Sequence, residues 1–135
     1  MRFLLFSAAL IGSAASAETM PWEHGAALYQ PKSMTAVRDT GPIVISGSEV
    51  TFDQKAVAAL DEVDWAWRDW NGDGTKETAK VYRISGGTFC DGEAVFVAFY
   101  STAYGFGVSA FRGSSVPHDV HSDGLCATYS YDPSW

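Results

Sequence analysis

The amino-acid sequence predicts a mainly β protein, built as a small antiparallel β-barrel or a two-sheet sandwich of about seven or eight short strands, with at most one short helix. Clusters of β-branched and aromatic residues are separated by glycine-rich polar turns at short intervals. Several clusters alternate apolar and polar residues, which is the period of a half-buried strand. The chain of 135 residues has room for one small core.

The first elements are expected ahead of residue 53. Residues 18–32 contain two prolines and no clear period, so we expect an irregular lead-in. Residues 34–37 have the composition of a short strand, which would end at an Asp-Thr-Gly-Pro turn signal. Residues 43–45 and 50–52 are apolar runs on either side of a Gly-Ser pair, which predicts a β-hairpin.

Residues 54–67 fit two structures. Val57, Leu60 and Val63 would lie on one face of a helix, and the alanines around them favour helix. The alternative is an extended strand that is interrupted near Asp61. We expect a helical turn.

Four later segments are expected to be strands. Residues 79–84 form the first, and residues 94–100 are apolar at every position, which suits a central strand covered on both faces. Residues 105–111 and 125–131 alternate between apolar and polar positions. In the last segment one face would carry Leu125, Ala127, Tyr129 and Tyr131.

Residues 1–17 are expected to form a cleavable secretory signal peptide. Arg2 supplies a positive start, residues 3–12 are almost entirely apolar, and Ala-Ser-Ala at 15–17 fits the small-x-small cleavage rule. The apolar run is shorter than the about 20 residues that a membrane-spanning helix needs. We therefore expect a single mature domain over residues 18–135, exported to the bacterial periplasm or secreted.

The two cysteines of the chain, Cys90 and Cys126, are expected to form one disulfide. An even cysteine count is typical of disulfide-bonded exported proteins. The bond would join the last strand to the turn that precedes the strand at 94–100. In the chain-entropy model, closing a loop of this length stabilises the fold by roughly 3–4 kcal/mol.

The charge balance restricts the partners. The chain has 9 basic and 16 acidic residues, and its formal net charge is −7. This balance argues against nucleic acid and against anionic membrane surfaces, because both require a basic protein surface. It is compatible with a basic partner protein, with metal ions, or with plain solubility.

A calcium loop is the sharpest local motif. The run that begins at Asp69 is similar to the D-x-N-x-D-G loops of EF-hands and bacterial repeat modules, in which alternate residues supply oxygen ligands and a glycine permits the sharp turn. The twelfth position of an EF-hand, a bidentate glutamate, is Lys80 here, and the alternative is a polar turn that leads into the next strand. The expected ligands are the side chains of Asp69, Asn71 and Asp73, the backbone carbonyl of Thr75, and Glu77.

Three tryptophans, Trp65, Trp67 and Trp70, fall close together. We expect them to pack in the core, which is the usual role of aromatic residues in a small β-domain. The alternative is an apolar pocket or a recognition face.

The strand pattern, the size and the cysteine pair resemble those of small exported bacterial β-proteins, among them lipocalin-like barrels and the periplasmic lysozyme inhibitors. Those inhibitors carry a Ser-Gly-x-x-Tyr element that enters the lysozyme cleft. The similar element here is the run from Ser85 to Phe89, with phenylalanine in place of tyrosine. The resemblance implies a compact barrel that binds a basic protein or a small apolar ligand.

These observations favour a non-enzymatic, exported binding or inhibitor-type protein of the bacterial cell envelope. The chain has no G-x-S-x-G nucleophile motif, and both cysteines are expected to be oxidised. A calcium-stabilised structural domain is the alternative, and an enzyme of unrecognised type ranks last.

Overall fold

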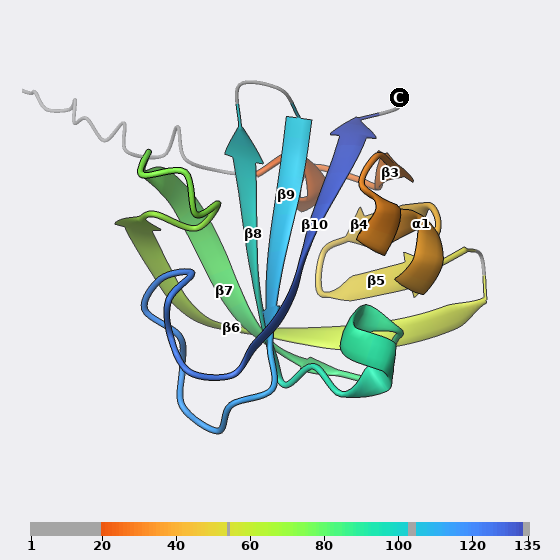
Figure 1. Cartoon of the computed structure of the whole chain (residues 1–135). Helices are drawn as coiled ribbons and strands as arrows, with labels where there is room; N and C mark the ends of the chain where they lie inside the picture. The colour runs from red at the N-terminus through yellow and green to blue at the C-terminus, as the bar shows by residue number, and fades with distance from the viewer. Residues whose placement is uncertain (1–19, 54, 103–104, 134–135) are drawn as a thin grey trace, which may run out of the picture.

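The fold is an eight-stranded closed antiparallel barrel with the strand order β10-β3-β4-β5-β6-β7-β8-β9 (Figure 1). The structure is a computed structural model that describes residues 20–53, 55–102 and 105–133. It confirms the mainly β class and shows a barrel rather than a sandwich. The expected signal peptide, residues 1–17, lies outside the described residues.

The elements follow one another in simple order along the chain. Within the described ranges, no helix is long and apolar enough to cross a membrane. The helical elements are the 3-10 turns η2 (Pro21–Glu23) and η3 (Phe89–Gly92) and the α-helix α1 (Met34–Asp39). The strands are β3 (Ala27–Pro31), β4 (Ile43–Ser46), β5 (Glu49–Phe52), β6 (Ala56–Arg68), β7 (Glu77–Ser85), β8 (Phe96–Thr102), β9 (Gly105–Phe111) and β10 (Leu125–Pro133).

Most of the strands expected from the sequence are confirmed. β4 and β5 form the expected hairpin, in which Ile43 is opposite Phe52, and Gly47 takes a φ of 58° at the turn. The expected strands at 79–84 and 105–111 are confirmed as β7 and β9. Those at 94–100 and 125–131 correspond to β8 and β10, each with its limits shifted by a few residues.

Residues 34–37, expected to be a strand, belong instead to helix α1. The Ser33 hydroxyl caps the helix by accepting the Ala36 N–H, and the Thr40 and Gly41 amides close its other end on the Ala36 carbonyl. Gly41, at a φ of 63°, then turns the chain into β4. Local capping decides the structure here, because only Ala36 of the helix is buried.

Residues 54–67 were expected to be helical, but residues 56–67 form most of strand β6; residue 54 lies outside the described residues. Ala58 and Leu60 face the barrel core, and Val57 and Ala59, the two neighbours of Ala58, are exposed, which is the period of a strand. Pairing with β7 along almost the whole strand outweighs the weak helix preference of the alanines.

The expected irregular lead-in also contains a strand. β3 pairs with β10 on one side and with β4 on the other, so it closes the barrel. Its inward residues, Ala27 and Tyr29, are buried. The two prolines lie outside the strand or at its last residue, where the loss of an N–H is tolerated.

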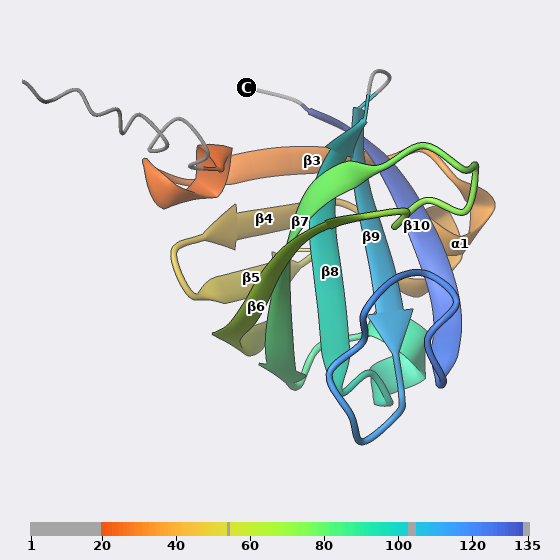
Figure 2. The same ribbon diagram turned by 90° about the vertical axis from the view of Figure 1, so that its left-hand side faces the viewer.

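Aromatic side chains fill the barrel interior. Barrels of eight strands have an interior that side chains can just fill. Trp22 of η2 closes one end: it is 1% exposed, it lies 5.5 Å from both Phe99 and Phe106 between ring centroids, and its Nε1 donates to the Tyr82 hydroxyl at 3.1 Å. Figure 2 shows η2 at one end of the barrel and η3 at the other.

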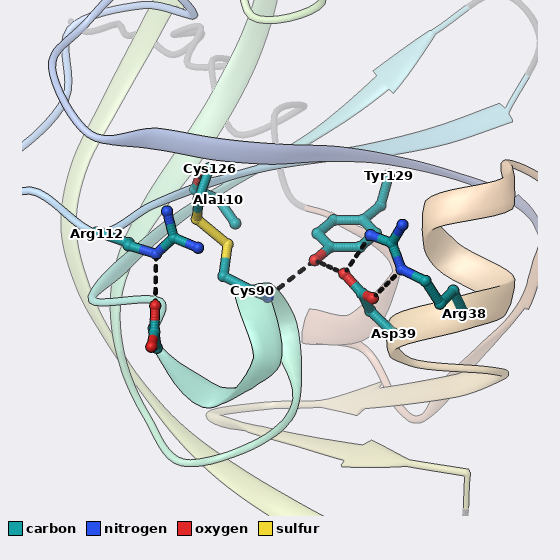
Figure 3. Close-up of a disulfide and its surroundings, with 8 residues drawn as sticks. Arg38, Asp39, Cys90, Ala110, Arg112, Cys126 and Tyr129 are labelled. Atoms are coloured by element: carbon teal, nitrogen blue, oxygen red, sulfur yellow. Dashed lines mark hydrogen bonds and ion pairs between the residues drawn. A yellow bond between two sulfur atoms is a disulfide. The ribbon is translucent and has the colours of Figure 1, made fainter.

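The opposite end is closed by α1 and η3, and the expected disulfide between Cys90 and Cys126 joins η3 to β10 (Figure 3). Beside it, the Tyr129 hydroxyl accepts the Cys90 N–H at 2.9 Å and donates to the Asp39 carboxylate at 2.8 Å. Arg38 also bonds to this carboxylate. Helix, turn and last strand are thus tied together by one covalent bond and one polar network.

We expect Trp22→Ala to lower the free energy of unfolding by about 3–5 kcal/mol, because it removes the ring that closes the barrel and leaves a cavity. Chemical denaturation followed by circular dichroism measures the change. Met34→Ala is the control: Met34 is 82% exposed, so its loss should change the same quantity by less than about 0.5 kcal/mol. Equal effects of the two variants would contradict the role given to Trp22.

The hydrogen bonds and charge of Arg38 outweigh burial and hold the pKa of Asp39 below its ordinary value of 3.8. A depressed carboxyl pKa contributes stability that is fully present above pH 3.8 and is lost as the pH falls through the lower, folded-state value. We expect Asp39→Asn to be less stable than the wild type at neutral pH and to lose less stability below pH 3.8. Parallel pH dependences in denaturant titrations would contradict this account.

Candidate functional site

The β6–β7 hairpin extends beyond the barrel. β6 pairs with β5 only from Ala56 to Ala59, but it pairs with β7 from Ala59 to Arg68. Figure 1 shows β6 running from the side of β5 across to its end beside β7. The outer half of β6 therefore has β7 as its strand neighbour on one side alone among the described residues.

The inner face of this hairpin leads out of the core into solvent. Ile84 and Tyr82 of β7 face the barrel interior, so Lys80 and then Thr78 follow on the same face. Their cross-strand partners on β6 are Trp65 and Trp67. The two indoles are 44% and 60% exposed, respectively.

A β-bulge in β6 aligns these tryptophans. Glu62 is opposite Tyr82 and Asp64 is opposite Val81, so Val63 is the extra residue. Val63 packs against an apolar cluster on the outer side of β7, β8 and β9. The bulge thereby places Trp65 and Trp67 on the inner face, beside Lys80.

Lys80, Glu23 and Glu62 form a group of ion pairs where this face meets the barrel. The Lys80 ammonium bonds to Glu23 of η2 and lies 3.6 Å from a Glu62 carboxylate oxygen. Burial opposes the charge of Lys80, but the bond with Glu23 and the proximity of Glu62 outweigh it and raise the pKa of Lys80. The lysine is thus held charged at the base of the exposed face.

The tip of the face is a shallow, open depression of about 450 Å³, lined by Trp65, Ala66, Trp67 and Thr78. Lys76 lies over the Trp67 ring, with its nitrogen 5.0 Å from the ring centroid. Exposed indoles beside cations can anchor a partner by apolar burial and by stacking. We call Trp65, Trp67, Thr78 and Lys80 the hairpin face.

The expectation that all three tryptophans pack in the core was correct only for Trp70, which is fully buried. For Trp65 and Trp67 it was wrong, and the alternative of a recognition face is the one compatible with their exposure. The i, i+2 spacing of this pair would have placed both on one face of a strand. The expectation of a helix over residues 54–67 was incompatible with this strand spacing.

The loop with the predicted calcium ligands is anchored by Trp70. The indole is buried in the outer cluster, and its Nε1 donates to the Ala66 carbonyl at 3.1 Å. Both carboxylate oxygens of Asp69 accept backbone N–H groups, from Gly72 at 2.8 Å and Gly74 at 3.1 Å. Through these two hydrogen bonds Asp69 stabilises the turn directly, with no ion involved.

The other predicted ligands also engage the loop. One Asp73 oxygen accepts the Thr75 N–H at 2.9 Å and the other accepts the Asn71 amide at 3.2 Å. Glu77 accepts the Trp70 N–H, and burial, with Asp73 and Asp69 nearby, raises the pKa of Glu77. Over the described ranges, no three His, Cys, Asp or Glu side chains are grouped to hold a metal. Calcium binding stays a prediction.

The element that resembles the lysozyme inhibitors faces inward. The Phe89 ring is buried, with its centroid 5.0 Å from that of Phe52 and 5.1 Å from that of Tyr129. A Cβ at Gly87 would lie 2.3 Å from the Phe52 ring, so this turn requires glycine for close packing. In this arrangement Phe89 contributes to the core and is not presented to a partner.

Comparison of the chain with protein-family models, with curated proteins and with solved structures finds no match. The geometry of the hairpin face is therefore the basis for any functional assignment.

The calcium prediction is tested by the melting temperature in calcium and in EDTA. A cation that binds only the folded state stabilises it, by about 2.7 kcal/mol when the free cation concentration is a hundred times Kd. We expect calcium to raise the melting temperature of the wild type and to raise it less in Asp69→Asn, with Asp123→Asn as the control acid. An unchanged value in the wild type would contradict calcium binding and leave Asp69 with its structural role.

Proposed function

We propose that the protein is an exported, non-enzymatic binding domain of the cell envelope that engages a basic partner protein through the hairpin face. The observation that carries this proposal is the exposure of Trp65 and Trp67 side by side on paired strands. Tryptophan side chains are usually largely buried in folded proteins. Two neighbouring tryptophans that stay exposed therefore favour a binding role for this surface.

The position of the indoles favours binding. Trp65 and Trp67 are opposite Lys80 and Thr78 on β7, so paired strands fix their backbones. Tryptophan has few rotatable bonds and is enriched among residues that dominate binding energy. A preorganised pair loses little conformational entropy when a partner covers it.

The face itself carries cations, since Lys80 pairs with Glu23 and Glu62 and Lys76 lies over Trp67. The acidic residues beside it favour a cationic partner. Asp61, Glu62 and Asp64 are exposed on β6, and Glu49 is exposed where β5 begins. The chain as a whole has a formal net charge of −7. Such a surface attracts basic proteins over a distance and increases their rate of association.

The filled interior favours a surface site over a site in the lumen. Tyr29, Phe99 and Phe106 lie in contact inside the barrel, with a Tyr29–Phe106 centroid distance of 4.1 Å. A small apolar ligand, the other partner class that the sequence suggests, would therefore also meet the protein on the hairpin face.

Two basic proteins, a lysozyme and a cytochrome c, serve as probes in calorimetric titrations at low salt, with an acidic protein of similar size as the negative control. We expect the wild type to bind at least one basic probe, with an affinity that falls as salt is added. The double variant Trp65→Ala/Trp67→Ala should bind at least about tenfold more weakly.

Met34→Ala, at the opposite end of the barrel, is the matched control and should bind like the wild type. The proposal fails if neither basic probe binds. It also fails if the double variant, shown to be folded by circular dichroism, binds as tightly as the wild type.

A further inference from the structure

The outer half of β6 has an open strand edge. The last described hydrogen bond on this side of β6 runs from the Leu60 N–H to the carbonyl of Ser48, the residue before β5, at 2.8 Å. Beyond it, the described part of the chain places no strand beside β6 on that side. The edge runs from Asp61 to Arg68.

The register shows which backbone groups face outward. The Ile84 N–H donates to the Val95 carbonyl, on the side of β8. Backbone direction alternates along a strand, so Lys80 and Thr78 also direct their N–H and C=O groups toward β8. Their partners Trp65 and Trp67 consequently direct theirs away from β7, into the open edge.

Neighbouring side chains bond to these outward groups. The Asp64 carboxylate accepts the Trp65 N–H at 2.8 Å, and the Arg68 guanidinium donates to the Trp67 carbonyl at 2.9 Å. Both bonds are exposed to solvent. They therefore cover the edge with groups that a competing strand can displace at small cost.

We propose that the open edge from Asp61 to Arg68 is a strand-addition site for an extended cationic segment of the partner. This inference rests on the proposed function and specifies how the partner binds. The added segment would pair with the outward backbone groups of Trp65 and Trp67. Its alternate side chains would contact the two indoles on the hairpin face.

Charge selects this occupant over a second copy of the chain. Glu49, Asp61, Glu62 and Asp64 are exposed along the start of the edge, with Arg68 as the basic residue at its end. Two copies would each bring a formal charge of −7, so their association is opposed by repulsion. The bulge at Val63 also twists the edge, a feature that hinders pairing between identical flat edges.

The probe is a short peptide of alternating lysine and valine, compared with a glutamate–valine peptide and with a lysine–valine peptide that is N-methylated at alternate residues. N-methylation removes the donors from one edge of the peptide and leaves its charge unchanged. We expect only the unmethylated cationic peptide to bind tightly. Amide hydrogen exchange of Trp65 and Trp67, measured by NMR, should then become at least tenfold slower.

Two variants separate edge pairing from attraction by charge. Asp64→Asn and Asp64→Ala both remove the negative charge, but asparagine retains an oxygen that can accept the Trp65 N–H and alanine does not. We expect Asp64→Ala to bind the cationic peptide roughly two- to fivefold more tightly than Asp64→Asn, because no local hydrogen bond has to be broken. Equal affinities, or the reverse order, would count against edge pairing.

Three results would overturn strand addition. In the first, the peptide binds without slowing exchange at Trp65 and Trp67. In the second, a basic protein probe binds through the hairpin face but the peptide does not; both of these results leave the proposed function intact. In the third, sedimentation shows a dimer whose Trp65 and Trp67 amides are protected without peptide, which assigns the edge to a second copy. Loss of all binding to basic probes is instead the failure of the proposed function itself.

Discussion

The difference in length between two neighbouring strands determines the main features of this molecule. β5 spans Glu49–Phe52 and β6 spans Ala56–Arg68, so the barrel closes through the first residues of β6 only. The remaining length of β6 pairs with β7 and projects from the barrel. Exposure of Trp65 and Trp67, and the open edge beside them, both follow from this mismatch.

Packing at the two barrel ends leaves the outside as the place for binding. Trp22 closes one end, and the Cys90–Cys126 disulfide holds η3 against β10 at the other. Aromatic rings fill the space between the two ends, so the barrel interior is closely packed and the scaffold is rigid. A rigid scaffold can present an exposed pair of indoles in a fixed arrangement, which limits the entropy lost on binding.

Alternating residues made part of the fold predictable. β9 and β10 follow from a period of two, β4 and β5 follow from apolar runs on either side of a Gly-Ser pair, and the even cysteine count led to the disulfide. β6 and α1 could not be predicted in the same way, because long-range pairing decides β6 and the Ser33 cap decides α1. The candidate calcium loop could be identified from its D-x-N-x-D-G motif. The hairpin face has no such motif, because the exposure of Trp65 depends on where β5 begins, at Glu49, and no local sequence pattern indicates this.

The central claim is that the edge of β6 beside Trp65 and Trp67 is open in the free protein. Residue-resolved amide hydrogen exchange of the unbound chain tests this most directly. Backbone direction alternates along β6, so we predict fast exchange at Trp65 and Trp67 and slow exchange at Ala66, whose N–H faces β7, and at Ala58, whose N–H faces β5. Uniformly slow exchange from Trp65 to Trp67 would show that the edge is covered and would contradict the account.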